Sequence, residues 1–268
     1  MIPYYQFTQI HIGPITVQVW GLLVALGIGA ALLVIYRRSG RLGLDQRRML
    51  DLAFWVIVGA FVGARVGYAF YNPQYIFADV GNFFRVWEGG LSIMGGFAGA
   101  FALGYPYMRR HKLDFVRYAD VVFYALPLGL AIGRCGCGLI HDHIGKETTM
   151  PWGVRWTDGT IRHENGLYDA VNGLVLFVVM VSLYRRPRWR GFAMVVFFVW
   201  YGVVRFWLDF LRATDVPGSD VRWWGLTPAQ YVSLLMVGLG LYWWWKWRKG
   251  QVVDGGGAAG ARAQKKAN

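Results

Sequence analysis

Charged side chains are scarce in this sequence. Only 16% of its 268 residues are Asp, Glu, Lys or Arg, and 56% are hydrophobic, whereas a soluble domain has about 25% charged residues. This balance excludes an ordinary soluble globular domain. Cysteine is also rare, and a disulfide between the two cysteines, Cys135 and Cys137, would close a very small, strained ring. No Lys or Arg precedes the first apolar run, so we expect a membrane span there and no cleavable signal peptide.

The hydrophobic residues fall in runs of about 20, the length that crosses a bilayer as a helix. The runs cover 15–36, 50–71, 90–108, 117–140, 166–184, 192–212 and 227–245. They are continuous rather than alternating, which favours helices over a β-barrel. The sequence therefore predicts an all-α polytopic membrane protein with seven transmembrane helices in one domain over residues 1–249. The Gly- and Ala-rich segment 250–268 is predicted to be a disordered cytoplasmic tail.

The basic residues lie mainly on one side of the predicted membrane. Nineteen of the 28 Lys and Arg residues fall in the segments 37–48, 109–117, 185–190 and 246–266. Cytoplasmic loops carry such an excess, so we expect the N-terminus outside and the C-terminus in the cytoplasm. The same distribution argues against nucleic-acid binding, because the charge is spread as a topology signal.

Four arginines lie within or at the ends of apolar runs, namely Arg65, Arg134, Arg205 and Arg212. Charges there are expensive and usually functional. Arg205 and Asp209 are four residues apart and can pair on one helix face. They form either a structural ion pair or a cation aimed at an anionic substrate with a carboxylate that holds its geometry. Arg65, among small residues, either binds backbone carbonyls or contacts substrate.

Arg134 opens the most unusual stretch of the chain, "GRCGCGLIHDHIG" at 133–145. The surrounding glycines allow close approach of a ligand, and the planar guanidinium binds phosphate in a bidentate manner. We therefore expect Arg134 to bind a phospholipid phosphate. His141 and His143 would face the same way in an extended chain, so a zinc site with Cys137 is one interpretation. Packing of small apolar cysteines is the favoured one.

The predicted outer loop, 141–165, contains turn signals around a short apolar stretch. We expect a strand at "WGVRW" and a hairpin turn at "TDGT".

Several stretches together resemble one known family. They are "GPITVQVWGL", "GARVGYAFYN", "FRVWEGGLSIMGGFAG", "GRCGCGLIHDHIGK", "RHENGLYDA", "YGVVRFWLDFLR" and "GLTPAQYVSL". In this order, over residues 12–247, the chain resembles the prolipoprotein diacylglyceryl transferases of bacterial inner membranes. The resemblance implies seven spans and a site facing the periplasm or outer leaflet. It also implies transfer of a diacylglyceryl group from phosphatidylglycerol to the cysteine thiol of prolipoprotein signal peptides, with no cofactor and no metal.

The resemblance also implies roles for individual residues. Arg134 and Gly145 match the Arg and the last Gly of the family's central motif, and Arg205 and Asp209 match an essential Arg and its acidic neighbour. His163 and Tyr168 match a further stretch. Taken with the chemistry above, the expected catalytic residues are Arg134, Arg205, Asp142, His143 and His141. The expected substrate-binding residues are Arg134, Arg65, Asp209, Gly145, His163 and Tyr168.

The chain departs from the family pattern at several polar positions. Trp20 replaces a Tyr, Met94 a His that is a proposed proton acceptor, and Cys137 an Asn. One interpretation is that His143 or His141, oriented by Asp142, deprotonates the substrate thiol instead. The alternative is a divergent paralogue that binds anionic phospholipid without prolipoprotein transferase activity.

Overall fold

A computed structural model describes residues 1–13, 15–74, 80–84, 90–186, 188–216 and 219–247. The predicted tail 250–268 lies outside the described residues. The chain forms two compact units, one of residues 1–42 with 119–268 and one of residues 43–118.

The described chain is mainly helical. The helices are α1 (Val19–Arg41), α2 (Gln46–Tyr71), α4 (Ile93–Arg110), α5 (Phe115–Ile140), α6 (Asn165–Leu183), α7 (Phe192–Leu208) and α8 (Pro228–Trp247), with short 3-10 turns η1 (Val80–Phe84) and η3 (Asp209–Leu211). Each predicted apolar run corresponds to one of these helices, so the prediction of a mainly helical fold is confirmed.

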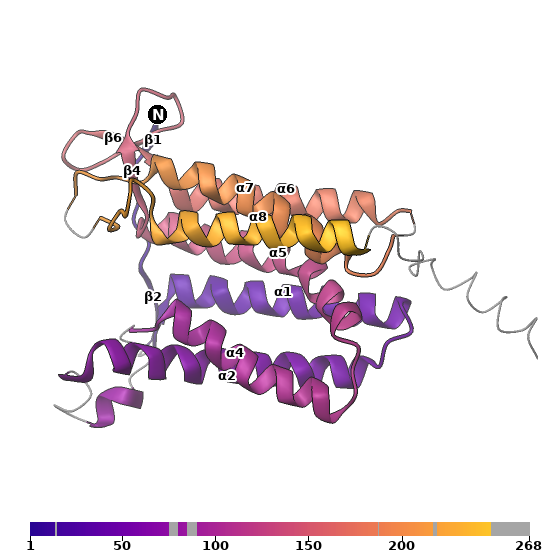
Figure 1. Cartoon of the computed structure of the whole chain (residues 1–268). Coiled ribbons are helices and arrows are strands. Elements are labelled where there is room, and N and C mark those ends of the chain that lie inside the picture. The colour runs from indigo at the N-terminus through magenta and orange to yellow at the C-terminus, as the bar shows by residue number, and fades with distance from the viewer. Residues whose placement is uncertain (14, 75–79, 85–89, 187, 217–218, 248–268) are drawn as a thin grey trace, which may run out of the picture. The chain divides into compact units, whose positions relative to one another are not determined.

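Glycines set the helix packing of the larger unit. A Cβ on Gly27 of α1 would meet the backbone of α5 at Gly129, and a Cβ on Gly173 of α6 would lie 2.9 Å from the Pro127 carbonyl of α5. Small residues of this kind let helix backbones approach closely in membranes. The buried side chains of Leu176 and Phe197 add an apolar core between α6 and α7, and Figure 1 shows α5, α6, α7 and α8 running side by side.

Short strands gather at one end of these helices (Figure 1). The strands β1 (Ile2–Pro3), β5 (Val154–Arg155), β6 (Ile161–Glu164) and β4 (Ile144–Glu147) form a sheet in that order, and β2 (Gln9–Ile12) pairs with β3 (Ile15–Gln18) as a hairpin. β5 and β6 are antiparallel, with Arg155 opposite Ile161. The predicted strand and hairpin turn of the long loop are therefore confirmed.

In the smaller unit, helices α2 and α4 pack closely against each other. Glycines of α2 and α4 face one another so closely that a Cβ on Gly59, Gly63, Gly95 or Gly99 would collide with backbone of the other helix. Asp45 caps α2 by accepting a hydrogen bond from the Arg48 backbone N–H at 3.1 Å.

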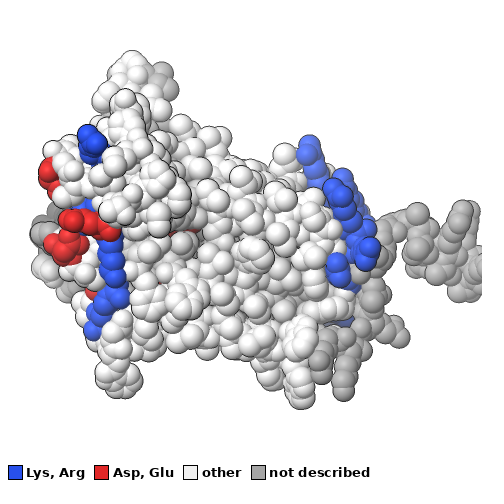
Figure 2. Space-filling view, turned by 90° about the horizontal axis from the view of Figure 1, so that it is seen from above, with Lys and Arg blue, Asp and Glu red and all other residues white. Residues whose placement is uncertain are grey.

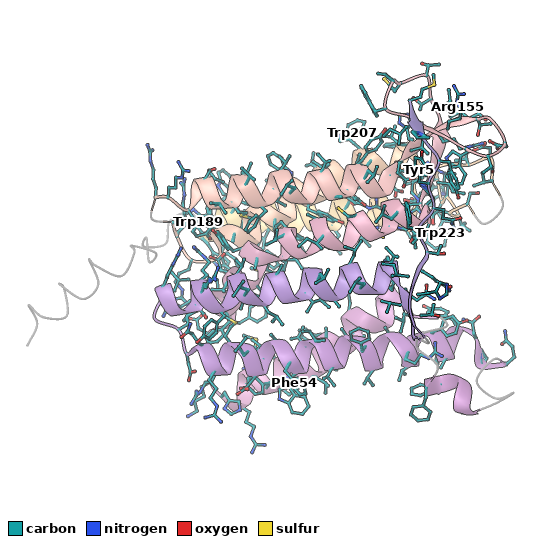
Figure 3. The ribbon with its side chains drawn as sticks, turned by 180° about the vertical axis from the view of Figure 1, so that it is seen from behind. Tyr5, Phe54, Arg155, Trp189, Trp207 and Trp223 are labelled. Atoms are coloured by element: carbon teal, nitrogen blue, oxygen red, sulfur yellow. The ribbon has the colours of Figure 1, made fainter. Side chains whose placement is uncertain are left out.

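The helices are suited to a membrane. Five of them are long and apolar enough to span a bilayer: α1, α2, α5, α6 and the stretch Phe192–Leu211. Figure 3 shows Trp207 and Trp223 beside the strands and Trp189 at the opposite end of the larger unit, as expected of aromatic side chains at two membrane interfaces. The space-filling view shows a nearly uncharged band between charged ends (Figure 2). The length and apolar composition of its helices thus identify the chain as a multi-pass membrane protein.

Candidate functional site

Three helices of the larger unit bring buried charges together at the strand end. Arg205 of α7 contacts Asp169 of α6 (Nη1 to Oδ2, 3.1 Å) and Asp209 of η3 (Nη2 to Oδ1, 3.1 Å). Arg134 of α5 reaches the same Asp169 oxygen through Nε at 3.6 Å. These four residues are called the arginine–aspartate cluster. The predicted pairing of Arg205 with Asp209 is confirmed.

The two arginines of the cluster are not equivalent. Arg205 lies between two carboxylates and its side chain is 11% exposed, whereas the side chain of Arg134 is 22% exposed and its carboxylate contact is longer. A guanidinium saturated by two carboxylates has less capacity for a ligand. Arg134 is therefore the better placed of the two to bind an incoming anion.

Asp209 is fully buried and joins α7 to the loop beyond it. It accepts a hydrogen bond from the Thr227 hydroxyl, which lies before α8, and its Oδ1 lies 3.8 Å from Arg212 Nη1. Arg212 in turn forms a β-bridge with Gly145 and pairs with Asp220 at 2.8 Å. Asp209 thus holds the end of α7 to α8 and to β4.

Gly145 lies where no side chain fits. A Cβ there would collide with the backbone and side chain of His163 on β6. His163 also interacts through Nδ1 with the Tyr168 hydroxyl at 2.8 Å, and burial lowers its pKa below the usual value. The structure therefore brings Gly145, His163 and Tyr168 together, beside the bridge from Gly145 to Arg212.

His143 is in direct contact with Arg134. Arg134 Nη1 donates to His143 Nε2 at 2.7 Å. Since a guanidinium is only a donor, Nε2 accepts and the imidazole is neutral with its proton on Nδ1, 3.5 Å from Asp142 Oδ1. Burial is the main cause that lowers the pKa of His143; Asp142 opposes it, and Arg134 and Arg212 reinforce it. His143 is therefore a neutral base poised beside the phosphate-binding candidate.

His141 has a different environment from His143. Its backbone adopts a left-handed φ of 55°, which turns the chain after α5, so the expectation that the two histidines face the same way is wrong. His141 Nδ1 lies 2.5 Å from Glu164 Oε2, and Nε2 lies 3.2 Å from the Tyr5 carbonyl. Its ring stacks on Tyr4 with 4.6 Å between centroids. His141 anchors the N-terminal segment, and both its nitrogens are occupied.

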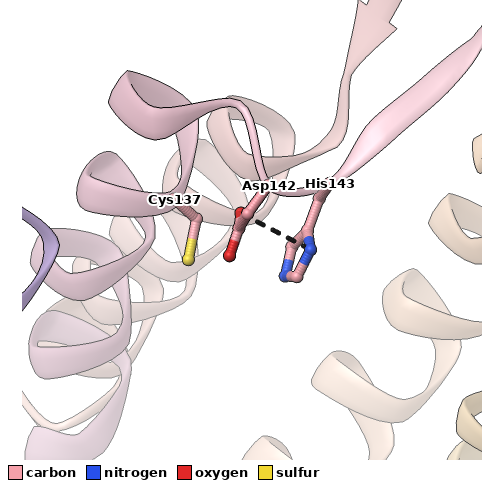
Figure 4. Close-up of side chains that lie close together, drawn as sticks. All are labelled: Cys137, Asp142 and His143. Carbon is pink, nitrogen blue, oxygen red and sulfur yellow. Dashed lines mark ion pairs between the residues drawn. The ribbon is translucent and has the colours of Figure 1, made fainter. Parts of the chain in front are cut away.

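The side chains that could bind a metal differ from the expected Cys137, His141 and His143. Ligand atoms of Cys137, Asp142 and His143 lie within 4.8 Å of one another (Figure 4). His141 does not belong to this group, because its ring points to Glu164. The interpretation of a site made by Cys137, His141 and His143 is corrected accordingly.

In the smaller unit, Arg65 is buried and binds backbone. Its Nε donates to the Phe83 carbonyl at 2.8 Å and its Nη1 to the Gly90 carbonyl at 2.7 Å. This is the carbonyl-binding role considered for it above. Met94, at the position of the family's histidine, is 55% exposed and lines an apolar groove along α2 and α4.

The sequence reasoning missed Asp169, which is the carboxylate shared by both arginines. Its signal was present, since an acidic residue inside the apolar run 166–184 is unusual. The sequence did not reveal that α6 packs against both α5 and α7. Tyr201, whose phenol interacts with Arg134 and Asp169, was missed for the same reason.

The fold and the site define a class of protein: a multi-pass membrane protein with a buried arginine–aspartate cluster and a neutral histidine at one end. Comparison with known proteins identifies one family. The family model for prolipoprotein diacylglyceryl transferase matches residues 8–246. The chain therefore belongs to the prolipoprotein diacylglyceryl transferase family.

Individual relatives align over nearly their whole length. A phosphatidylglycerol–prolipoprotein diacylglyceryl transferase of Pseudomonas putida is 34% identical, with 91% of this chain and 96% of the relative covered. The enzyme of the same name from Chromohalobacter salexigens is 35% identical, with 91% and 93% covered. The Pseudomonas fluorescens enzyme is 34% identical, with 91% and 95% covered.

Proposed function

We propose that this protein transfers a diacylglyceryl group from phosphatidylglycerol to the cysteine thiol of prolipoprotein signal peptides. The relatives' names give the reaction. The observation that carries it to this chain is the contact of Arg134 with both Asp169 and His143. The Arg134 guanidinium therefore links the arginine–aspartate cluster, which can bind an anion, to His143, which can accept a proton.

The enzyme spans the bacterial inner membrane with all seven helices and places its site at the outer leaflet. The basic end supports this orientation: Arg38 lies over the rings of Tyr124 and Tyr184, 4.0 Å from each centroid, so the C-terminal ends of α1 and α6 lie together. The arginines of 37–41 and 185–190 therefore share the end away from the strands and the cluster. Basic ends face the cytoplasm.

Arg134 binds the phosphate of phosphatidylglycerol. The guanidinium pairs with two phosphate oxygens and stays charged at any physiological pH. Asp169 and Arg205 fix its position from behind, and Arg205 adds a second positive charge as the leaving group gains negative charge. Gly145, His163 and Tyr168 form the adjoining wall of the substrate site, and Arg65 binds the carbonyls of Phe83 and Gly90 rather than the phosphate.

His143 is the proton acceptor. When Arg134 turns to phosphate, Nε2 is released and takes the proton of the substrate thiol, with Asp142 beside Nδ1 to stabilise the imidazolium. The thiolate attacks the glyceryl carbon, a C–S bond forms and the C–O bond to phosphate breaks. Glycerol phosphate leaves with the bonding electrons, and His143 returns its proton to the leaving phosphate or to water. His141 is bound to Glu164 and Tyr5, so the geometry favours His143.

The test is complementation of a strain depleted of its own transferase. Wild type is expected to restore growth, and Arg134→Ala to fail, because the phosphate loses its bidentate guanidinium partner. Arg155→Ala, an exposed arginine of β5, is the matched control and is expected to rescue. With purified protein, His143→Ala is expected to lower the rate of thioether formation by about 100-fold or more.

Two results would overturn the proposal. One is failure of the wild type to rescue despite expression in the membrane. The other is binding of phosphatidylglycerol without thioether formation on a signal peptide, which would identify the divergent lipid-binding paralogue instead.

A further inference from the structure

Three side chains with metal-binding atoms converge beside Arg134. Cys137 Sγ, one Asp142 carboxylate oxygen and one His143 ring nitrogen lie within 4.8 Å of one another, and in the described part of the chain no other group of three such residues is as compact. Figure 4 shows Cys137 on the last turn of α5 and Asp142 and His143 just beyond it, with their side chains close together. Ligands of a tetrahedral Zn²⁺ lie about 3.5 Å apart. Side-chain shifts of about 1 Å would complete three-ligand coordination.

Two further observations point to a ligand at this place. His143 Nδ1 is buried and makes no hydrogen bond, and a buried polar atom without a partner often marks the position of a missing ligand or an ordered water. Since no hydrogen bond holds its proton, Nδ1 can lose that proton and bind a metal. The Asp142 side chain is 37% exposed, which gives a path from solvent. Thiolate, imidazole and carboxylate are also the ligand types that Zn²⁺ uses.

We propose that Cys137, Asp142 and His143 form a Zn²⁺ site whose occupation removes Arg134 from His143. The fourth position of the ion is left to water, as in open three-ligand zinc sites. The inference goes beyond the proposed function. Binding of the ion by Cys137, Asp142 and His143 does not depend on that function, whereas the inhibitory effect of the ion rests on it.

The competition with Arg134 follows from the hydrogen bonds. Arg134 Nη1 lies 2.7 Å from His143 Nε2 and 3.9 Å from Cys137 Sγ, so it uses the lone pairs that a metal needs. A metal on Nε2 displaces Arg134 directly. A metal on Nδ1 moves the imidazole proton to Nε2, where it faces the Arg134 N–H. In both cases Arg134 leaves His143.

Asp169 can receive the displaced guanidinium. Its Oδ1 is buried without a hydrogen-bond partner, and its Oδ2 already lies 3.6 Å from Arg134 Nε. Zn²⁺ would thus occupy His143, and the displaced Arg134 guanidinium would move closer to Asp169 in the arginine–aspartate cluster. Bound Zn²⁺ therefore acts as an inhibitor of the site rather than as a cofactor.

The test uses Co²⁺, a spectroscopic substitute for Zn²⁺, on the purified full chain in detergent after treatment with a chelator. We expect one Co²⁺ per chain, with near-ultraviolet absorption from a cobalt–thiolate bond that added Zn²⁺ removes. Cys137→Ser is expected to abolish the band. Cys135→Ser, an exposed cysteine two residues earlier, is the matched control and is expected to keep it.

A second variant tests the competition. Arg134→Ala removes a positive charge next to the ion and is expected to tighten Co²⁺ binding by about tenfold or more. Circular dichroism shows whether Cys137→Ser folds. If it does not, His143→Ala replaces it, and this variant is expected to bind Co²⁺ at least about tenfold more weakly.

Absence of a thiolate band in the wild type, or its loss in Cys135→Ser alone, would overturn the site. Unchanged affinity in Arg134→Ala would overturn the competition. The cobalt measurements need no transferase activity, so failure of complementation leaves them unaffected.

Discussion

Asp169 decides where both arginines of the cluster point. It is buried, and one of its oxygens contacts Arg205 at 3.1 Å and Arg134 at 3.6 Å. Removing one partner of a buried ionic group is strongly destabilising, by about 3–5 kcal/mol, because a charge is left uncompensated. With two guanidinium groups on one carboxylate, the loss also allows the arginines to separate by mutual repulsion.

We expect Asp169→Asn to lower kcat/KM for diacylglyceryl transfer by about 100-fold, the loss that about 1 Å of misplacement produces. The KM for phosphatidylglycerol is expected to rise, since Arg134 is no longer held in place. Asp169→Glu keeps the charge and is expected to restore part of the activity. The measurement is steady-state kinetics on purified protein.

Asp158→Asn is the control for this substitution, because Asp158 is exposed in the turn before β6 and is expected to have wild-type kinetics. A folded Asp169→Asn protein with unchanged KM and kcat would show that Asp169 does not position the arginines.

At the scale of whole elements, hydropathy was a good predictor of helix existence and a poorer one of helix ends. The predicted run 166–184 coincides with α6 to within one residue at each end, but 15–36 became α1 at Val19–Arg41. Residues 15–18 alternate apolar and polar side chains and pair with β2 instead, while the basic end of α1, residues 37–41, continues past the apolar run. Hydropathy records burial in lipid, whereas caps and strand pairing decide where a helix begins and ends.

The site could be predicted only in part for a related reason. Arg134, Arg205 and Asp209 stand out in the sequence because charges within apolar runs are rare. No local sequence pattern predicts that α5, α6 and α7 pack against one another, so Asp169 was not predicted as a site residue. The left-handed backbone of His141 could not be predicted either. His141 binds Glu164, whereas His143 lies beside the cluster.

The α2–α4 pair offers an element-scale prediction. In Gly99→Ala the new methyl would collide with the Gly59 carbonyl oxygen, which is backbone and cannot rotate away. We expect the substitution to lower the free energy of unfolding by about 1–3 kcal/mol, measured as a lower Tm of the purified protein. Gly29→Ala in α1 is the matched control, because nothing lies within 4 Å of its Cβ position. It is expected to leave Tm unchanged or slightly raised, since Ala favours a helix. Equal Tm changes in the two variants would contradict close α2–α4 packing.

At the scale of the whole molecule, the arginine-rich segments and the candidate site lie at opposite ends of the larger unit. The arginines of 37–41 and 185–190 lie at one end, and the strands with the arginine–aspartate cluster lie at the other. This polarity makes membrane orientation part of the mechanism. A lipid-modifying site that acts on exported signal peptides works only if the strand end faces outward.

Cysteine labelling tests this orientation. In a background of Cys135→Ser and Cys137→Ser, we introduce Arg155→Cys in β5 or Arg186→Cys after α6, both at exposed positions. Arg155→Cys is expected to react with a membrane-impermeant maleimide in intact spheroplasts. Arg186→Cys is expected to react only after permeabilisation, because a loop rich in arginine is retained in the cytoplasm. The reverse pattern would put the cluster on the cytoplasmic side. It would then remove Arg134 and His143 from contact with outer-leaflet phosphatidylglycerol, whatever their geometry.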